Sequence, residues 1–203
     1  MQLHFLSTLG LFLLLVNIDS GFSQDRQDRC LRLKEITKKA HVDLLGKDYP
    51  WWYGLGLMRA ETNCRWVKSL DGHGSVGYAQ ITPKFLDNVL RPLFPDYDKE
   101  FSTDHFYALA YLTGLELRRA CRLWQVYQAY NGGSLVYREC KRAQSCEWQE
   151  CKKECRRKDV CVWMTKAGCK QYRNACEINY SYSQKVYRFG QVYREGEDRL
   201  RFW

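Results

Sequence analysis

The chain has 203 residues, of which 45% are hydrophobic, and a formal net charge of +9 at pH 7. A chain of this length and composition can bury one sizeable core, so it is most simply one domain. Its sequence has no internal repeat and no low-complexity linker, which argues against a repeat protein or a string of tethered modules.

The first 23 residues are predicted to be a secretory signal peptide. Residues 5–18 form an apolar run that is shorter than the ~20 residues that a membrane span requires. Small residues follow at Ser20, Gly21 and Ser23, as before a cleavage site. No Lys or Arg precedes the run, so a retained signal anchor that tethers the protein to a membrane is the alternative. Residues 24–203 would form the domain.

Apolar residues at helical spacing predict that most of this domain is helical. One helix covers residues 33–44 and can end at Gly46, and another covers 106–119 and begins after Ser102 or Thr103. A closing amphipathic helix is predicted from apolar residues at i, i+4, i+7 and i+11, namely Tyr182, Val186, Phe189 and Tyr193.

Glu61 is the strongest candidate for a chemical role. Asp48 can cap a helix that starts near Trp51. Trp51, Leu55 and Met58 recur at i, i+4 and i+7, and Glu61 lies three residues beyond Met58 on the same face. Burial beside these side chains disfavours the carboxylate and should raise the pKa of Glu61. An acid that delivers a proton near neutral pH needs such a shift.

Two further motifs follow this helix. The stretch GSVGYAQITP at 74–83 is rich in glycine and predicts tight turns or a small hairpin near Asp71. Within it, Thr82 and Pro83 are typical of the N-cap and first residue of another helix. The stretch QAYNGG at 128–133 ends a helix whose apolar residues recur from Leu123 to Tyr130.

In this order and spacing, Glu61, the glycine-rich stretch with Gln80, and Tyr130 with Asn131 resemble the soluble lytic transglycosylase family of the lysozyme superfamily. The resemblance covers residues 51–133. It departs from the family pattern where Tyr78 and Ala79 replace Leu and Met, which would reshape the wall of the sugar groove. The expected fold is mainly α and lysozyme-like, with a small hairpin near Asp71.

The resemblance implies a secreted or periplasmic enzyme that cleaves the bond between MurNAc and GlcNAc in peptidoglycan. Glu61 would protonate the bridging oxygen and then act as base while the MurNAc C6 hydroxyl closes onto C1, which leaves a 1,6-anhydro end. Thr62, Gln80, Tyr130 and Asn131 would orient the sugar and the acid. Such a reaction needs no metal and no cofactor, and a monomer is expected.

Two alternatives use the same scaffold. A goose-type lysozyme would hydrolyse the same bond, with Asp71 positioning a water molecule. A non-catalytic cell-wall-binding protein would instead rely on the Cys-rich segment that follows Gly133.

The chain has ten Cys, which together with an export signal predict up to five disulfides. Seven of them lie between residues 140 and 176, and three are dispersed at Cys30, Cys64 and Cys121. Because seven is odd, full pairing requires an odd number of bridges between the two sets. Zinc is a competing interpretation, but the cluster has no C-x-x-C pair and no nearby His.

Residues 134–176 look like a basic insertion that the usual family pattern lacks. From 138 to 173 there are eleven Lys or Arg against five Asp or Glu. Nucleic acid is one conceivable partner, but an exported chain without a recognisable nucleic-acid fold favours an anionic cell envelope instead. We expect the insertion to border the cleft and to expose the charges of Lys152, Lys153, Arg156 and Arg157.

Overall fold

The structure is a computed structural model that describes residues 29–69, 74–165 and 167–195. The predicted leader at 1–23 and Asp71 therefore lie outside the described residues. The helices are α2 (Lys34–Leu45), α3 (Trp52–Thr62), α4 (Pro83–Leu90), α5 (Asp104–Leu117), α6 (Leu123–Gly132), α7 (Leu135–Ala143), α8 (Trp148–Lys153) and α9 (Ala175–Gly190), followed by a 3-10 helix, η1 (Gln191–Tyr193). The strands are β1 (Val160–Thr165) and β2 (Gly168–Arg173).

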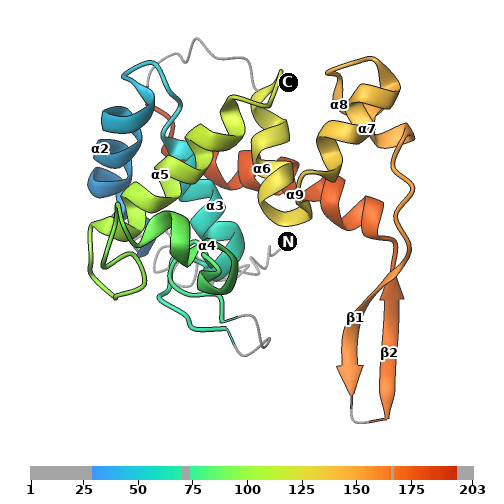
Figure 1. Ribbon diagram of the computed structural model, residues 1–203, viewed down its shortest axis with the longest axis horizontal. Coiled ribbons are helices and arrows are strands. Elements are labelled where there is room, and N and C mark those ends of the chain that lie inside the picture. The colour runs from blue at the N-terminus through green and yellow to red at the C-terminus, as the bar shows by residue number, and fades with distance from the viewer. Residues whose placement is uncertain (1–28, 70–73, 166, 196–203) are drawn as a thin grey trace, which may run out of the picture.

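The fold is mainly α, as predicted, and its core lies among α2, α3, α5, α6 and α9 (Figure 1). Helix α9 packs against both α3 and α6, and α2 packs against α5. The largest fully buried side chains of this core include Trp124, Tyr53, Tyr97, Tyr127, Leu55, Leu57, Met58 and Leu109. In the described part of the chain, every helix is too short or too polar to cross a membrane.

Most of the predicted helix boundaries are confirmed. Helix α2 ends at Gly46, whose φ of 93° suits glycine. Pro83 begins α4 directly after Thr82, and α5 begins directly after Thr103. The predicted cap at Asp48 is wrong, because the N-cap of α3 is Trp51 and no side chain caps that end. A tight turn precedes α3, so Asp48 is not positioned at its first turn.

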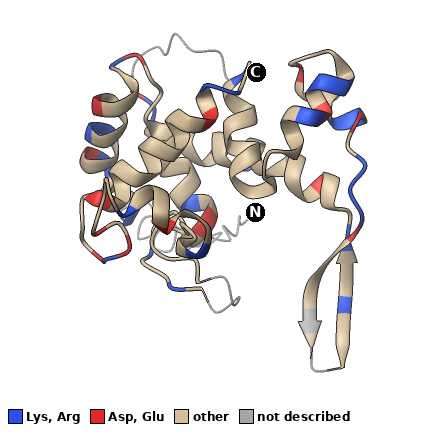
Figure 2. Cartoon of the chain, viewed as in Figure 1, with Lys and Arg blue, Asp and Glu red and all other residues tan. Residues whose placement is uncertain are grey.

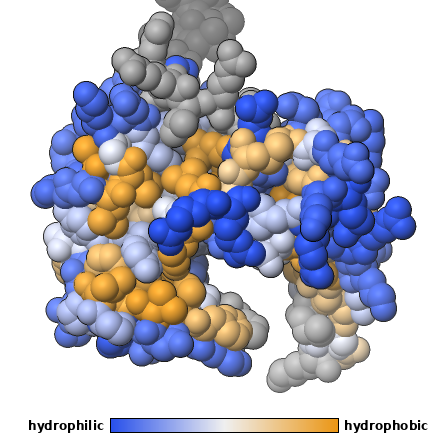
Figure 3. Space-filling model, turned by 45° about the horizontal axis from the view of Figure 1, so that its top comes forward, coloured by the Kyte–Doolittle hydropathy of each residue, from blue (hydrophilic) through white to orange (hydrophobic). Residues whose placement is uncertain are grey.

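The sheet lies in a different place from the predicted hairpin. Strands β1 and β2 form an antiparallel pair in which Val160 faces Arg173 and Cys161 faces Tyr172. Around the predicted position the described residues form isolated bridges, from Val76 to Lys68 and to Ile81. The β hairpin extends away from the helical body, and the space-filling view shows open space between them (Figures 1 and 3).

All ten cysteines form disulfides, so their thiolates are not available to bind zinc. The pairs are Cys30–Cys64, Cys121–Cys146, Cys140–Cys151, Cys155–Cys176 and Cys161–Cys169. One bridge joins the dispersed set to the cluster, which confirms the odd number that was predicted. Five disulfides are typical of a protein that folds in an oxidising compartment.

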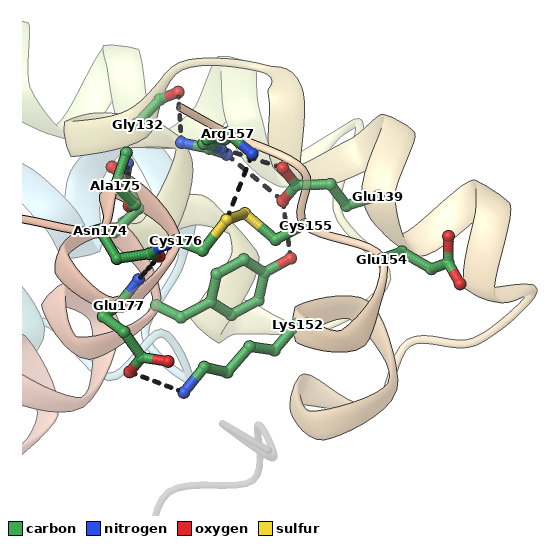
Figure 4. The surroundings of a disulfide bond; sticks show 12 residues. Gly132, Glu139, Lys152, Glu154, Cys155, Arg157, Asn174, Ala175, Cys176 and Glu177 are labelled. Carbon is green, nitrogen blue, oxygen red and sulfur yellow. Dashed lines mark hydrogen bonds and ion pairs between the residues drawn. A yellow bond between two sulfur atoms is a disulfide. The ribbon is translucent and has the colours of Figure 1, made fainter. Parts of the chain in front are cut away.

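The basic insertion forms a lobe of α7, α8 and the hairpin, and Figure 2 shows Lys and Arg along its helices and the connection to β1. The expectation that Arg157 is exposed is wrong. Its guanidinium forms a buried ion pair with Glu139 at 2.9 Å, beside the disulfide between Cys155 and Cys176 (Figure 4). Lys152 pairs with Glu177 and Lys153 with Glu150. These three of the four side chains that were expected to expose free charge are therefore paired with carboxylates.

Candidate functional site

Helix α3 carries Glu61 from the core to the surface. Residues Trp52 to Met58 are all buried, whereas the last turn, which includes Glu61, is only partly buried. The helix ends at Asn63, whose φ of 55° is left-handed and breaks the helical path. The predicted geometry is thus confirmed, because the carboxyl lies at the end of an apolar face and not on a fully solvated one.

Tyr182 of α9 contacts Glu61 directly, since its hydroxyl donates a hydrogen bond to Glu61 Oε1. Gly56 makes this contact possible by letting the two helices approach closely. A Cβ atom added at Gly56 would lie 2.3 Å from the carbonyl oxygen of Val186 on α9. The close crossing of α3 and α9 therefore sets the position of the tyrosine relative to the acid.

Burial raises the pKa of Glu61 above its ordinary value. Two neighbours oppose this shift: the hydroxyl of Tyr182, which donates to the carboxylate, and the positive charge of Lys185. Burial outweighs them, so the protonated acid is favoured relative to a carboxyl in water. The direction of this shift is the one that a proton donor near neutral pH requires.

The glycine-rich stretch packs beside the end of α3. Thr62 Oγ1 lies 2.8 Å from the carbonyl oxygen of Tyr78. Gly77 has a φ of +84°, and a Cβ atom there would lie 2.2 Å from the ring of His105. The Nε2 atom of His105 accepts a hydrogen bond from the Ala79 backbone N–H at 3.2 Å. Because the ring fills the space that a side chain would need, this position requires glycine.

Gln80 and Tyr130 hold the same stretch from its other side. The amide nitrogen of Gln80 donates to the carbonyl oxygens of Val67 and Gly77, each at 2.9 Å. The hydroxyl of Tyr130 on α6 donates to the Ala79 carbonyl oxygen at 2.7 Å. Burial and, secondarily, the Glu61 carboxylate raise the pKa of Tyr130 well above its ordinary value. Tyr130 therefore lies close enough to Glu61 for an electrostatic interaction between the two side chains.

Two cavities adjoin these residues. The larger, of about 810 Å³, is lined by Arg29, Arg59, Ala60, Glu61, Thr62, Asn63, Arg65, Val67, Lys185 and Phe189. The smaller, of about 280 Å³, is lined by Gln80, Ile81, Thr82, Leu86, Leu112, Thr113, Leu115, Glu116, Val126, Ala129 and Tyr130.

The predicted site residues are therefore only partly brought together. Glu61 and Thr62 line the larger cavity, whereas Gln80 and Tyr130 line the smaller one. Asn131 is exposed and lines neither of these two cavities. The residues that line the larger cavity all lie outside the insertion at 134–176, so the expectation that the insertion borders this cleft is wrong.

Three residues of the site were not predicted as such. The helical spacing predicts that Tyr182 lies on the apolar face of the closing helix, but this pattern does not reveal that its hydroxyl reaches Glu61. Lys185 and His105 do not belong to any of the sequence motifs described above. The glycine at position 77 is the one sequence signal that bears on His105, but a glycine in a turn does not reveal which side chain packs against it.

Comparison of the chain with protein-family models, with curated proteins and with solved structures finds no match.

Proposed function

We propose that this protein is a secreted or periplasmic lytic transglycosylase with a lysozyme-like domain, acting on peptidoglycan glycan strands. The observation that carries the proposal is the state of Glu61. It is a partly buried acid with a raised pKa in the wall of a cleft, and a tyrosine hydroxyl fixes one of its oxygens. Among the described residues that line this cleft, Glu61 is the only carboxylic acid.

A single acid is enough for an intramolecular reaction. Glu61 donates its proton to the oxygen that bridges MurNAc C1 and GlcNAc C4, and the C1–oxygen bond breaks. The resulting carboxylate then takes the proton of the MurNAc C6 hydroxyl as that oxygen bonds to C1. Water is not consumed, and Glu61 ends the cycle protonated again.

The other residues support the acid in different ways. The hydroxyl of Tyr182 orients the Glu61 carboxyl and stabilises the carboxylate that forms after proton donation. Thr62 and Tyr130 position the backbone of residues 78–79 beside the acid. Gln80 and Tyr130 are then available to contact sugar in the smaller cavity, whereas the exposure of Asn131 favours no direct role.

The test is a Glu61→Gln variant acting on purified sacculi, because Gln preserves size but cannot supply a proton. We expect release of soluble fragments to fall by about 100-fold to 10,000-fold. Glu35→Gln, which removes an exposed carboxylate on α2, is the matched control and should retain full activity. Equal turnover by the Glu61→Gln variant and the parent would contradict the proposal.

Mass spectrometry of the products distinguishes the lyase from a hydrolase. A lytic transglycosylase yields ends that are lighter by one water molecule and takes up no label from heavy-oxygen water. Reducing ends that carry the label would instead identify a goose-type hydrolase. Binding to sacculi without any release of fragments would identify a non-catalytic wall-binding protein.

A further inference from the structure

The cleft that holds Glu61 is strongly cationic. Four basic side chains line it: Arg29, Arg59, Arg65 and Lys185. They come from separate parts of the chain, since Arg59 lies on α3, Lys185 on α9, and the two remaining arginines outside the long helices. Their convergence on one cavity is therefore a product of the tertiary fold and not of a basic run in the sequence.

A disulfide holds the backbones of two of these arginines close together, and both line the same cavity. Arg29 directly precedes Cys30, and Arg65 directly follows Cys64. The Cys30–Cys64 bridge holds the two cysteine Cα atoms 5.2 Å apart. Bringing two like charges to one cavity is unfavourable unless an anion joins them, because their repulsion is not offset.

No carboxylate of the described chain forms an ion pair with any of the four. The contrast with other basic residues is clear, since Arg91 pairs with two aspartates and Arg157 with a buried glutamate. In addition, Nη1 of Arg29 is buried and has no hydrogen-bond partner among the described residues. A buried donor without a partner is costly, so this cavity lacks an acceptor.

The remaining contacts shape the cavity without neutralising it. The Arg59 guanidinium lies 5.0 Å from the centre of the Phe189 ring, and Lys185 Nζ lies 5.7 Å from it. Lys185 also donates to the carbonyl oxygen of Ala60 at 3.0 Å. These contacts hold two of the cations at the cleft wall. Glu61 lines the same cavity, but among the described residues its carboxyl oxygen contacts the Tyr182 hydroxyl and forms no ion pair with any of the four cations.

We propose that this cationic part of the cleft is a subsite for a carboxylate carried by the glycan substrate. Arg29 and Arg65 would bind its oxygens, because a guanidinium offers two parallel donors to a carboxylate. In peptidoglycan the carboxylate is either the free lactyl group of MurNAc or, where that group is amidated, a carboxylate of the attached peptide. The proposal rests on the proposed function for the identity of the substrate.

A bound carboxylate would also assist the reaction. The positive charge of Lys185 favours the ionised form of Glu61 and so opposes its role as an acid. An anion bound among the four cations offsets this effect and helps Glu61 to retain its proton until the glycosidic oxygen receives it. Binding of a negatively charged substrate therefore raises the pKa of Glu61 relative to the free enzyme.

Binding to the Glu61→Gln protein by isothermal titration calorimetry tests the subsite without turnover. The probes are GlcNAc-MurNAc with a free lactyl carboxylate, the same disaccharide with its peptide, and chitobiose, which has no carboxylate. We expect the first two to bind at least about tenfold more tightly than chitobiose at low salt, and this preference to shrink at high salt. Whichever of the two binds more tightly identifies the source of the carboxylate.

The variants Arg65→Gln and Arg29→Gln/Arg65→Gln, each made in the Glu61→Gln protein, assign the effect to the cleft. The single change at exposed Arg65 should reduce the preference several-fold, and the double change should abolish it. Arg188→Gln, an exposed change on α9, should leave it unaltered. Equal binding of all three probes, or a preference that survives in the double variant, would overturn the subsite.

Failure of this subsite and failure of the proposed function have different signatures. If sacculi are cleaved by the parent but the probes bind equally, the subsite alone is wrong. If the carboxylate preference is present but Glu61→Gln retains full turnover on sacculi, the cleft binds anionic glycan and the catalytic role of Glu61 is wrong.

Discussion

At the scale of single residues, the decisive contact is between Tyr182 and Glu61. The donated hydrogen bond stabilises the carboxylate, whereas burial stabilises the neutral acid, and the second effect is the larger. Both effects are useful to a side chain that first donates a proton as an acid and then accepts one as a base. Burial shifts the equilibrium toward the protonated acid, and the hydroxyl stabilises the charge once the proton has left.

Tyr182→Phe removes this hydroxyl and should raise the pKa of Glu61 further. Because the acid must be protonated at the start of the reaction, the alkaline limb of the profile of kcat/KM against pH should move to higher pH. The loss at the optimum should be smaller than that of Glu61→Gln. Tyr187→Phe on the same helix is the control, and an unchanged alkaline limb in Tyr182→Phe would show that the hydroxyl does not tune the acid.

At the scale of elements, the insertion is anchored to the core by a buried polar cluster. Arg157 donates from Nε to Glu139 Oε1 at 2.9 Å and from Nη1 to the carbonyl oxygen of Gly132 at 3.3 Å. Tyr180 of α9 donates to Glu139 Oε2 at 2.7 Å. The side chains of Arg157 and Glu139 are only 10% and 4% exposed, so each depends on the other for compensation of its charge.

Arg157→Met should therefore destabilise the protein by about 3 to 5 kcal/mol, because it leaves Glu139 buried without its partner. The neighbouring Arg156 is the matched control, since its side chain is 80% exposed. Arg156→Met should change the free energy of unfolding by less than about 0.5 kcal/mol. Urea denaturation of both variants measures the difference, and similar midpoints would mean that the cluster does not anchor the lobe.

At the scale of the whole molecule, two buried histidines link stability to pH. His41 and His105 each hold Nδ1 within hydrogen-bond distance of a backbone carbonyl oxygen, at 2.8 Å and 2.7 Å. Burial lowers the pKa of each to about 4, from an ordinary value of 6.5. Between these two values the unfolded chain binds protons that the folded protein excludes, so stability falls as the pH falls.

The free energy of unfolding should thus decrease from about pH 6.5 to about pH 4, by on the order of 3 kcal/mol for each histidine. His41→Gln keeps a donor for the Thr37 carbonyl oxygen but cannot ionise, and it should remove about half of this decrease. Urea titrations at a series of pH values provide the measurement. A variant whose stability depends on pH as steeply as the parent's would exclude His41 as a source.

Local patterns in the sequence alone determined the helices outside the insertion at 134–176, the end of α2 at Gly46, the start of α4 after Thr82, the position of Glu61 on an apolar face and the odd number of bridges from the Cys cluster. Helices α7 and α8 of the insertion were not predicted. The helix features depend on residues only a few positions apart, and the odd number of bridges follows from the number of cysteines in the cluster. Only the tertiary structure decided that Tyr182, 121 residues away, reaches Glu61. It also decided that the Cys30–Cys64 bridge brings the backbones of Arg29 and Arg65 together, and that the side chain of Arg157 is buried while that of Arg156 is not. Such contacts depend on how helices cross and which cysteines pair, and periodicity within one segment carries no information about either.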